Sequence, residues 1–485
     1  MTLKARITAI DRFIKGCRED GIYDNLNACC VMAGWDSLAG ALTPLKGAAP
    51  TNNGLSNYDR GIGITGDGSS KYLDSNRASN ADGQDNAHMS AFISTFDTRF
   101  NTVSPGIYLG AAKAGQASRF DIGPYASILY ANNRCASQAV AGANPSATGL
   151  IGTSRPSPSE YSVRCSGSDF PQEVASVAPG TEDVFVLCRN SVGTPSSFSD
   201  ATIAFYSIGS ATDLAALDAR VSTLMADLRA IEETGFDRDA IAYIRAVEEA
   251  DGAYLETDVK IAVNNLVSGL KADGLWDAIG SSCLLCGPRT LAGALVPLRG
   301  AAPTAYGGWA SGDYDRATGL TGDPTASLYL DSNRANDADP QDDKHVAVYV
   351  KIPTDLDSLL FPLGTSSNGS TPGVTQLLVN GLSDNAIARI NGVSNVQLPY
   401  TYNQFSLFGA SRPDSETLNL RVSGSETSDA SDFQTPGADP ILLFGVGSGF
   451  LGGEIAYYSI GSHVDDLAAL ESHISAYVTA IGAAL

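Results

Sequence analysis

The sequence predicts a mainly β protein with flanking helices, built as two tandem jelly-roll β-sandwiches joined by a helical linker. Two observations carry this prediction. The chain of 485 residues repeats itself once, and within each repeat the spacing of apolar residues changes from helical to strand-like and back. The 50 Gly and 22 Pro residues supply the many turns that a set of short strands needs.

The repeat can be read letter by letter. Residues 38–50 read LAGALTPLKGAAP and residues 291–303 read LAGALVPLRGAAP, which are identical at 11 of 13 positions at an offset of 253. The sequence YSIGS also occurs twice, at residues 206–210 and 458–462. The offset carries Tyr254 onto Met1, so we expect a first unit that begins the chain with no domain ahead of it. The expected divisions are a first unit at 1–231, a helical linker at 232–253 and a second unit at 254–485.

Each unit is expected to open and close with a helix. Apolar residues near the start of each unit are spaced three and four apart, as on one face of a helix: Leu3, Ile7, Ile10, Phe13, Ile14 and Cys17 in the first, and Val259, Val263, Leu266, Val267 and Leu270 in the second. Short apolar runs between Gly, Pro, Asn and Ser clusters then predict sandwiches at about 36–209 and 289–461. Closing helices follow at 211–231 and 464–484, with Asp213 and Asp466 at their N-caps.

Charge excludes two classes of partner. The 53 acidic and 31 basic residues leave a net charge of -22, which repels a phosphate backbone and an anionic bilayer alike. The first residues carry charges throughout and lack the apolar core of an export signal. We therefore expect no nucleic-acid partner, no membrane partner and no signal peptide.

The eight cysteines do not repeat between the units, except for Cys30 and Cys283. A disulfide framework shared by both units is therefore not expected, and free buried thiols are favoured. Cys283 and Cys286 have CxxC spacing, but neither a second CxxC nor a histidine pair accompanies them. The sequence predicts no zinc site.

The most polar stretches shared by both units run from residue 72 to 88 and from 329 to 345. Their Asp and Asn oxygens could coordinate Ca²⁺ or contact a sugar, although the spacing is not that of a calcium loop and such residues also cap turns. The histidine that ends each stretch is either a structural hydrogen-bonding group, which we favour, or part of a binding surface. The candidate binding residues are Asp74, Asn76, Asp82, Asp85, His88, Asp331, Asn333, Asp339, Asp342 and His345. No cofactor is expected, with Ca²⁺ as the alternative left open.

Catalysis is not predicted. Glycoside hydrolysis needs two carboxylates that flank one bond, and no E-x-D-x-x-E stretch or acidic pair shared by the units occurs. The sequence also lacks HExxH, G-x-S-x-G and a phosphate-binding P-loop. We therefore expect a protein without enzymatic activity.

One stretch of the second unit resembles a module of structural proteins from tailed bacteriophages. It reads KADGLWDAIGSSCLLCGPRTLAGALVPLRGAAPT from Lys271 to Thr304, followed by GDYDRATGLTGD and YLDSNRANDADPQDDKH. The resemblance covers nearly all of the second unit, and the first unit is a looser version of it. It implies a concanavalin A-like, laminin-G-like jelly roll on a virion, without catalytic residues to carry over.

The resemblance implies a non-catalytic virion protein of the tail, the baseplate or the head surface, with lectin-like modules that could bind host glycans. The expected partners are other virion proteins, a cell-surface glycan and further copies of the same chain, with a trimer favoured. Fold alone does not supply function. A virion enzyme that degrades polysaccharide therefore stays as the alternative.

Overall fold

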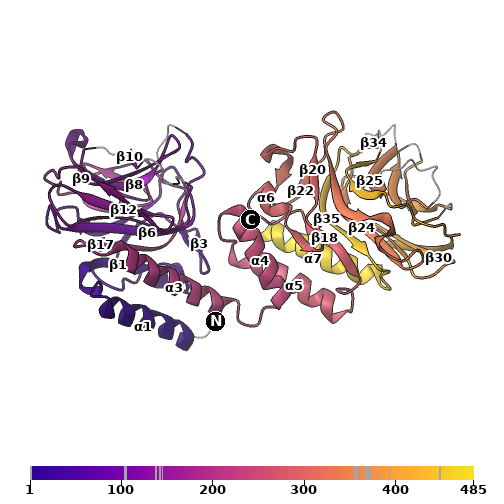
Figure 1. Cartoon of the computed structure of the whole chain (residues 1–485), viewed down its shortest axis with the longest axis horizontal. Helices are drawn as coiled ribbons and strands as arrows, with labels where there is room; N and C mark the ends of the chain where they lie inside the picture. Colours follow the sequence, from indigo (N-terminus) through magenta and orange to yellow (C-terminus); the bar gives the residue numbers. More distant parts are fainter. Residues whose placement is uncertain are drawn as a thin grey trace. The chain divides into compact units, whose positions relative to one another are not determined.

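The computed structural model describes residues 3–485 apart from 103–105, 137–138, 141–143, 145, 354–358, 366–372, 382, 393 and 447–448. The chain forms two compact units (Figure 1). Residues 1–235 and 252–257 make unit 1, and residues 236–251 and 258–485 make unit 2. The expected linker at 232–253 is thus divided between the two units, and its helix, α4 (Arg238–Asp251), packs with unit 2.

Unit 1 is a sandwich of two sheets. The helix-covered sheet has the strand order β13-β12-β11-β6-β17-β4-β3, with β1 also paired to β17. Its strands are β1 (Leu26–Val31), β3 (Tyr58–Asp59), β4 (Gly63–Thr65), β6 (Ala87–Thr95), β11 (Gly149–Arg155), β12 (Tyr161–Cys165), β13 (Ser168–Gln172) and β17 (Thr202–Gly209).

The second sheet of unit 1, the open sheet, has the order β10-β9-β8-β7-β14-β5-β2, with β15 and β16 beside β7. Its strands are β2 (Thr51–Asn53), β5 (Tyr72–Ala78), β7 (Leu109–Ala112), β8 (Arg119–Tyr125), β9 (Ile128–Cys135), β10 (Ala139–Val140), β14 (Asp183–Val186), β15 (Arg189–Ser191) and β16 (Thr194–Ser196). Because β5, β6 and β7 alternate between the two sheets, the unit has the jelly-roll arrangement that the sequence predicts.

Unit 2 repeats this plan. Its helix-covered sheet has the order β19-β18-β35-β24-β29-β30-β31, with β21 and β22 attached through β35. Its open sheet has the order β20-β23-β32-β25-β26-β27-β28, and β33 pairs with β34. The strands are β18 (Ile279–Leu284), β19 (Pro297–Arg299), β20 (Thr304–Tyr306), β21 (Tyr314–Asp315), β22 (Gly319–Thr321), β23 (Tyr329–Ala335), β24 (Lys344–Lys351), β25 (Leu359–Thr365), β26 (Gln376–Asn380), β27 (Asn385–Arg389), β28 (Val396–Pro399), β29 (Ser406–Arg412), β30 (Thr417–Val422), β31 (Ser425–Ala430), β32 (Pro440–Leu443), β33 (Gly445–Val446), β34 (Gly449–Phe450) and β35 (Glu454–Gly461).

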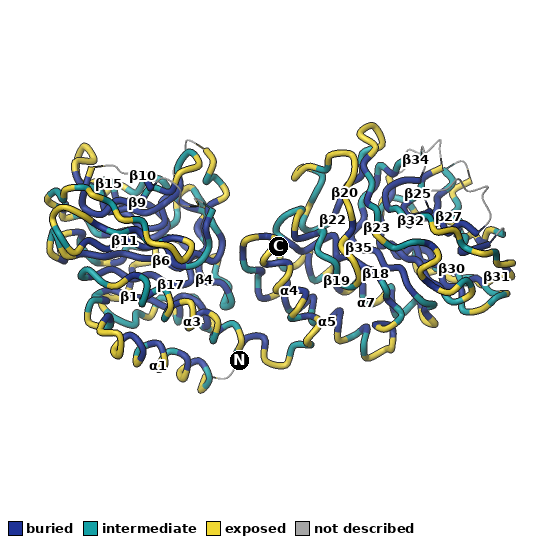
Figure 2. The backbone as a smooth tube through the Cα atoms, in the orientation of Figure 1, coloured by how far each residue is buried: buried dark blue, intermediate teal, exposed yellow. Residues whose placement is uncertain are grey.

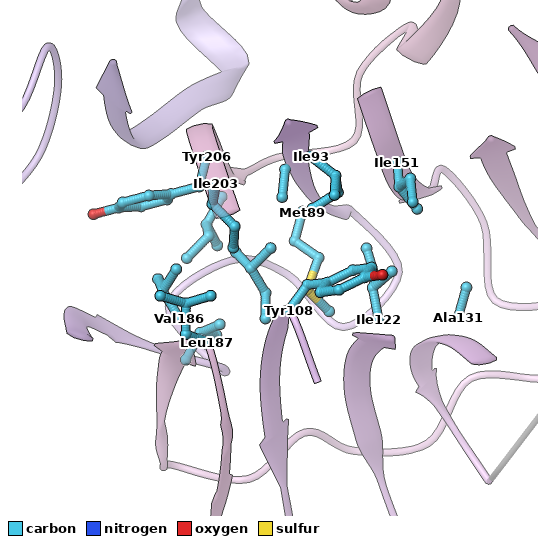
Figure 3. Close-up of a cluster of buried hydrophobic side chains, with 14 of the residues drawn as sticks. Met89, Ile93, Tyr108, Ile122, Ala131, Ile151, Val186, Leu187, Ile203 and Tyr206 are labelled. Carbon is cyan, nitrogen blue, oxygen red and sulfur yellow. The ribbon is translucent and has the colours of Figure 1, made fainter. Parts of the chain in front are cut away.

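The core of each sandwich lies between its two sheets. In unit 1, Met89 and Ile203 from the helix-covered sheet face Ile122 and Val186 from the open sheet (Figure 3). All four are buried. Figure 2 shows the same distribution along the backbone, with buried strands inside and exposed loops outside. Burial of apolar area between the sheets is the main stabilising term of such a fold.

Helices cover the outer face of the helix-covered sheets. The remaining helices are α1 (Leu3–Glu19), α2 (Leu38–Ala41), α3 (Leu214–Glu232), α5 (Thr257–Ala272), α6 (Leu291–Ala294) and α7 (Leu467–Ala484). In unit 1, Phe13 of α1 and Leu217 of α3 pack in one cluster with Phe205 of β17. The apolar residues of the closing helix therefore form a stripe that packs on its own sandwich. The predicted N-caps are confirmed, since Asp213 accepts the N–H groups of Ala215 and Ala216, and Asp466 accepts that of Ala469.

All eight cysteines are free and buried, which confirms the prediction from their unequal positions. Burial raises the pKa of Cys30 to about 11 and that of Cys283 to about 12, so these thiols stay protonated and unreactive near neutral pH. None of the helices in the described part of the chain is long and apolar enough to cross a membrane.

Candidate functional site

The polar stretch of unit 1 that the sequence singles out is tied down by its own side chains. Asp82 forms a two-point ion pair with Arg77, from Nε to Oδ2 at 3.0 Å and from Nη2 to Oδ1 at 2.5 Å, and Asn27 donates to the same carboxylate at 2.8 Å. Asp85 accepts a hydrogen bond from Ser176. These carboxylates therefore hold a loop in place.

His88 is fully buried on β6. Its Nδ1 lies 2.5 Å from the carbonyl oxygen of Ser210 and its Nε2 lies 3.0 Å from Oγ of Ser207. A carbonyl only accepts, so Nδ1 carries the proton and Nε2 accepts from the serine. Burial lowers the pKa of His88 to about 4, which keeps the ring neutral. The ring connects the end of one strand to its neighbour.

Asp74 and Asn76 form a local turn on β5, the strand next to the edge of the open sheet. Asp74 Oδ1 accepts the Asn76 N–H at 2.8 Å, and Asn76, at φ +52°, donates from Nδ2 to the carbonyl oxygen of Ala49 at 2.7 Å. A positive φ is tolerated best by Asn, Asp and Gly. This accounts for the repeated asparagine by backbone geometry.

Unit 2 places the corresponding residues in the same way. Arg334 pairs with Asp339 at 2.9 Å from Nε to Oδ2, and His345 Nδ1 lies 2.5 Å from the Ser462 carbonyl oxygen. Asp331 and Asn333 repeat the turn at 2.8 Å. Asp342 is exposed. In the part of the chain that the structure describes, no three His, Cys, Asp or Glu side chains come together as a set that could hold a metal ion.

A buried cation anchors this stretch in both units, but from different positions. In unit 1, Arg134 of β9 donates from Nη2 to the carbonyl oxygen of Ser79 at 2.5 Å. In unit 2, Lys344 of β24 donates to the carbonyl oxygen of Asn336, the counterpart of Ser79, also at 2.5 Å. Asn391 occupies the place of the arginine there. The function that the two units share is therefore the anchoring of the loop, which supports a structural role for the polar stretch.

The outer face of the open sheet in unit 1 carries a second polar group, which the sequence analysis missed. Strand alternation sends Phe120 and Ile122 of β8 into the core, so Arg119, Asp121 and Tyr125 point the other way. On β9 the outward residues include Tyr130 and Asn132, and Asn132 is the register partner of Asp121. The two long helices of unit 1, α1 and α3, pack on the opposite sheet (Figure 1).

Asp121 lies at the centre of this group. Asn132 Nδ2 donates to Oδ1 at 2.6 Å, Arg119 Nε donates to Oδ2 at 3.1 Å, and Arg189 Nη1 reaches Oδ2 at 3.5 Å. Asp121 is fully buried, whereas 13% of the Arg119 side chain stays exposed. Two guanidinium groups around one carboxylate give the group a net positive charge, in a chain whose total charge is -22. We name these four residues the Asp121 group.

Two tyrosines lie beside the Asp121 group on the same face. The rings of Tyr125 and Tyr130 meet edge to face, with centroids 5.5 Å apart and an interplanar angle of 69°. Both are half-buried, and the neighbouring Ile128 is 37% exposed. A polar group that fixes orientation next to aromatic faces is the usual composition of a small-ligand site.

The local sequence does contain a signal for this site. Tyr125 pairs with Ile128 across a two-residue turn, and Ala126 and Ser127 both have positive φ. That turn type joins adjacent strands of a hairpin and fixes which residues oppose each other. The alternation in RFDIGPYASILYANN therefore places Asp121 opposite Asn132, but it cannot bring in Arg189, which is 68 residues away.

Unit 2 lacks the Asp121 group. Gln376 and Arg389 are register partners where unit 1 has Asp121 and Asn132. Its open sheet instead has Tyr306 and Tyr329 as stacked cross-strand partners, with centroids 4.8 Å apart and 43% of Tyr306 exposed. The two units thus present different side chains on equivalent faces.

No family model and no curated protein matches the chain. Solved structures with a similar fold include a botulinum neurotoxin serotype D binding domain (10% identity, TM-score 0.29, 43% of this chain and 52% of that one). Mouse laminin α1 domains LG4-5 match at 12% identity and TM-score 0.22, over 80% of this chain and 87% of that one. The galectin LEC-6 of Caenorhabditis elegans matches at 12% and TM-score 0.19, over 25% of this chain and 84% of that one.

The chain spans about half the length of the botulinum domain. The fold class stands on the sheet order itself, which is that of a jelly-roll β-sandwich in each unit. These likenesses carry no conclusion about ligand. That has to come from the residues of this chain.

Proposed function

We propose that the chain is a non-catalytic, lectin-like protein that binds a cell-surface glycan on the open sheet of unit 1. The observation that carries this proposal is the Asp121 group beside Tyr125 and Tyr130. A sugar ring offers hydroxyl groups, which the partly exposed guanidinium of Arg119 can bind, and apolar C–H faces, which the half-buried rings of Tyr125 and Tyr130 cover. The buried Asp121 and Asn132 hold this guanidinium in place. Asp121 is fully buried and pairs with two arginines, so it is not placed to act as an acid or base on a glycosidic bond.

Replacing Tyr130 by Ala tests the site. We expect roughly tenfold weaker glycan binding, because loss of an aromatic contact is worth about 1 kcal/mol or slightly more. Tyr130→Phe should keep most of the affinity. The measurement is titration calorimetry with purified host capsular or lipopolysaccharide O-chain fragments, chosen by a glycan-array screen.

Tyr306→Ala in unit 2 is the matched control, since it removes an exposed aromatic residue from the equivalent sheet. It should leave the affinity unchanged. The proposal is wrong if Tyr130→Ala and Asp121→Asn both bind as well as the unchanged chain. Steady release of reducing ends from the same fragments would favour the polysaccharide-degrading alternative.

We further propose that the protein is a structural component of a tailed-phage virion, in the tail, the baseplate or the head surface. The support is the sequence resemblance at Lys271–Thr304 and in YLDSNRANDADPQDDKH. Labelled antibody seen on purified particles by electron microscopy would support this role, and particles that lack the label would contradict it.

Virion components act in symmetric arrays, so we propose a homo-oligomer, with a trimer favoured. The stripe of α3 is buried in its own unit and does not supply the contacts. Light scattering should give the mass of three chains, and a monomer at high concentration and in the particle would contradict the proposal.

A further inference from the structure

Unit 2 has a helix, α4, for which the described part of unit 1 shows no counterpart. Lys271 of α5 holds the start of α4, with Nζ 2.7 Å from Asp237 Oδ1 and 2.5 Å from Asp239 Oδ2. The Asp237 N–H donates to Asn264 Oδ1 at 2.8 Å. At the other end, Asp251 accepts the N–H and Oγ1–H of Thr290, the N-cap of α6.

The middle of α4 is bound by apolar contacts and one buried ion pair. Tyr243, Ile244 and Val247 are buried. Glu248 pairs with Lys260 of α5 at 3.3 Å, with both side chains almost fully enclosed. Trp276 and Leu298 line a pocket together with Tyr243 of α4, and each of the two is 8% exposed.

Unit 1 has residues of similar chemistry at three positions that lie beside α4 in unit 2. At the offset of 253, Arg18 stands for Lys271, Tyr23 for Trp276 and Lys46 for Arg299. Arg18 and Lys46 lie 4.8 and 4.6 Å from the centroid of the Tyr23 ring. Lys271 and Arg299 lie 5.2 and 4.9 Å from that of Trp276. Both units therefore present an aromatic ring between two cations.

This surface of unit 1 is open in the structure. Ile7, the counterpart of Lys260, is 56% exposed, and Leu3, one turn earlier on α1, is 62% exposed. Leu45 and Tyr23 are half-buried, whereas their counterparts Leu298 and Trp276 are buried. Leu3, Ile7 and Arg18 lie on one face of α1, because their spacing follows the helical period. We name Leu3, Ile7, Arg18, Tyr23, Leu45 and Lys46 the α1 face.

We propose that the α1 face binds an amphipathic helix of a partner protein, in the way that unit 2 binds α4. The two cations favour a helix with acidic residues in its first turn, as Asp237 and Asp239 are at the start of α4. Ile7 replaces Lys260, so the partner helix carries an apolar residue where α4 has Glu248. A glutamate at that position would be buried against isoleucine without a partner, which costs free energy.

The test uses the full chain and two labelled peptides. One peptide has the sequence of residues 236–251, FDRDAIAYIRAVEEAD, and the other differs only by Glu248→Leu. By fluorescence anisotropy, we expect the Glu248→Leu peptide to bind at least tenfold more tightly than the unchanged peptide. Ile7→Asp or Arg18→Glu in the chain should each weaken this binding at least tenfold, and both side chains are exposed enough for the variants to fold.

A charge exchange and a control complete the experiment. We expect binding to the Arg18→Glu chain to be restored when the Glu248→Leu peptide also carries Asp237→Lys and Asp239→Lys. Non-specific hydrophobic binding would not respond to this exchange of charges. Lys271→Glu in unit 2 should leave peptide binding unchanged, and a loss there would show that the peptide displaces α4 instead. Absence of binding, binding that ignores Ile7→Asp, or self-association of the chain that Ile7→Asp abolishes would each overturn the proposal, the last because a second copy would then cover the face.

Discussion

Acidification from pH 6.5 to pH 4 is expected to destabilise each unit by about 3 kcal/mol through one buried histidine. Burial lowers the pKa of His88 and of His345 from 6.5 to about 4. Between these two pH values, the imidazole is protonated in the unfolded chain but stays neutral in the folded chain. The stability contributed by each neutral ring is complete above pH 6.5 and is lost as the pH falls towards 4.

Asp183 of unit 1 and Asp251 of unit 2 oppose this effect in part, because burial raises the pKa of each carboxyl group and the folded chain then binds its proton more readily. The carboxylates with lowered pKa in unit 1, such as Asp97, lose their contribution only below their ordinary range. In unit 2, His463 has a raised pKa because its ring donates a hydrogen bond to the Asp343 carboxylate, so its stabilisation is present at low pH and is lost as the pH rises. Unit 1 should therefore show the steeper acid destabilisation.

The measurement is urea unfolding at pH 7 and pH 4.5, followed by tryptophan fluorescence. His88→Gln removes the titrating ring, so the variant should lose less stability between the two pH values than the unchanged chain, whatever its stability at pH 7. His345→Gln is the matched variant for unit 2. Equal pH dependence in all three proteins would show that the two rings do not control acid stability.

Replacing Leu217 by Asp is expected to cost about 5 kcal/mol or more and to unfold unit 1. Leu217 is on α3 and is fully buried in the cluster that α3 forms with α1 and the helix-covered sheet. An aspartate at this position would be enclosed without a partner. Thermal unfolding by circular dichroism would show the loss of one of two transitions. Thr223→Asp, at an exposed position of the same helix, should change stability by less than about 1 kcal/mol.

The same variant decides how the stripe of α3 is used. An unfolded unit 1 means that the stripe packs within its own sandwich, as the structure has it. A folded protein with a smaller oligomer would mean instead that the stripe is an interface between chains, which would contradict the packing described above.

Local sequence patterns determined the architecture of this protein. The repeat at residues 38–50 and 291–303 fixed the number of units, and the change of period predicted helices on both sides of each sandwich. Asp213 could be placed at an N-cap because a short acceptor just before an apolar period is a local feature. The unequal cysteine positions likewise predicted free thiols.

Tertiary structure alone decided the role of the polar residues. Asp82 and His88 were singled out for their chemistry, but whether an Asp binds a ligand or an Arg depends on which groups the fold brings within 3 Å, and here these are Arg77 and a backbone carbonyl. The Asp121 group depends on two tertiary features. The register of β8 and β9 sets Asp121 opposite Asn132, and the pairing of β15 with β7 brings Arg189 close to Asp121. The anchoring cation shows the same limit, because Arg134 and Lys344 reach equivalent carbonyl oxygens from positions that no sequence comparison aligns. A hydrogen bond is set by the position of two atoms in space, and chains that differ in sequence can place those atoms alike.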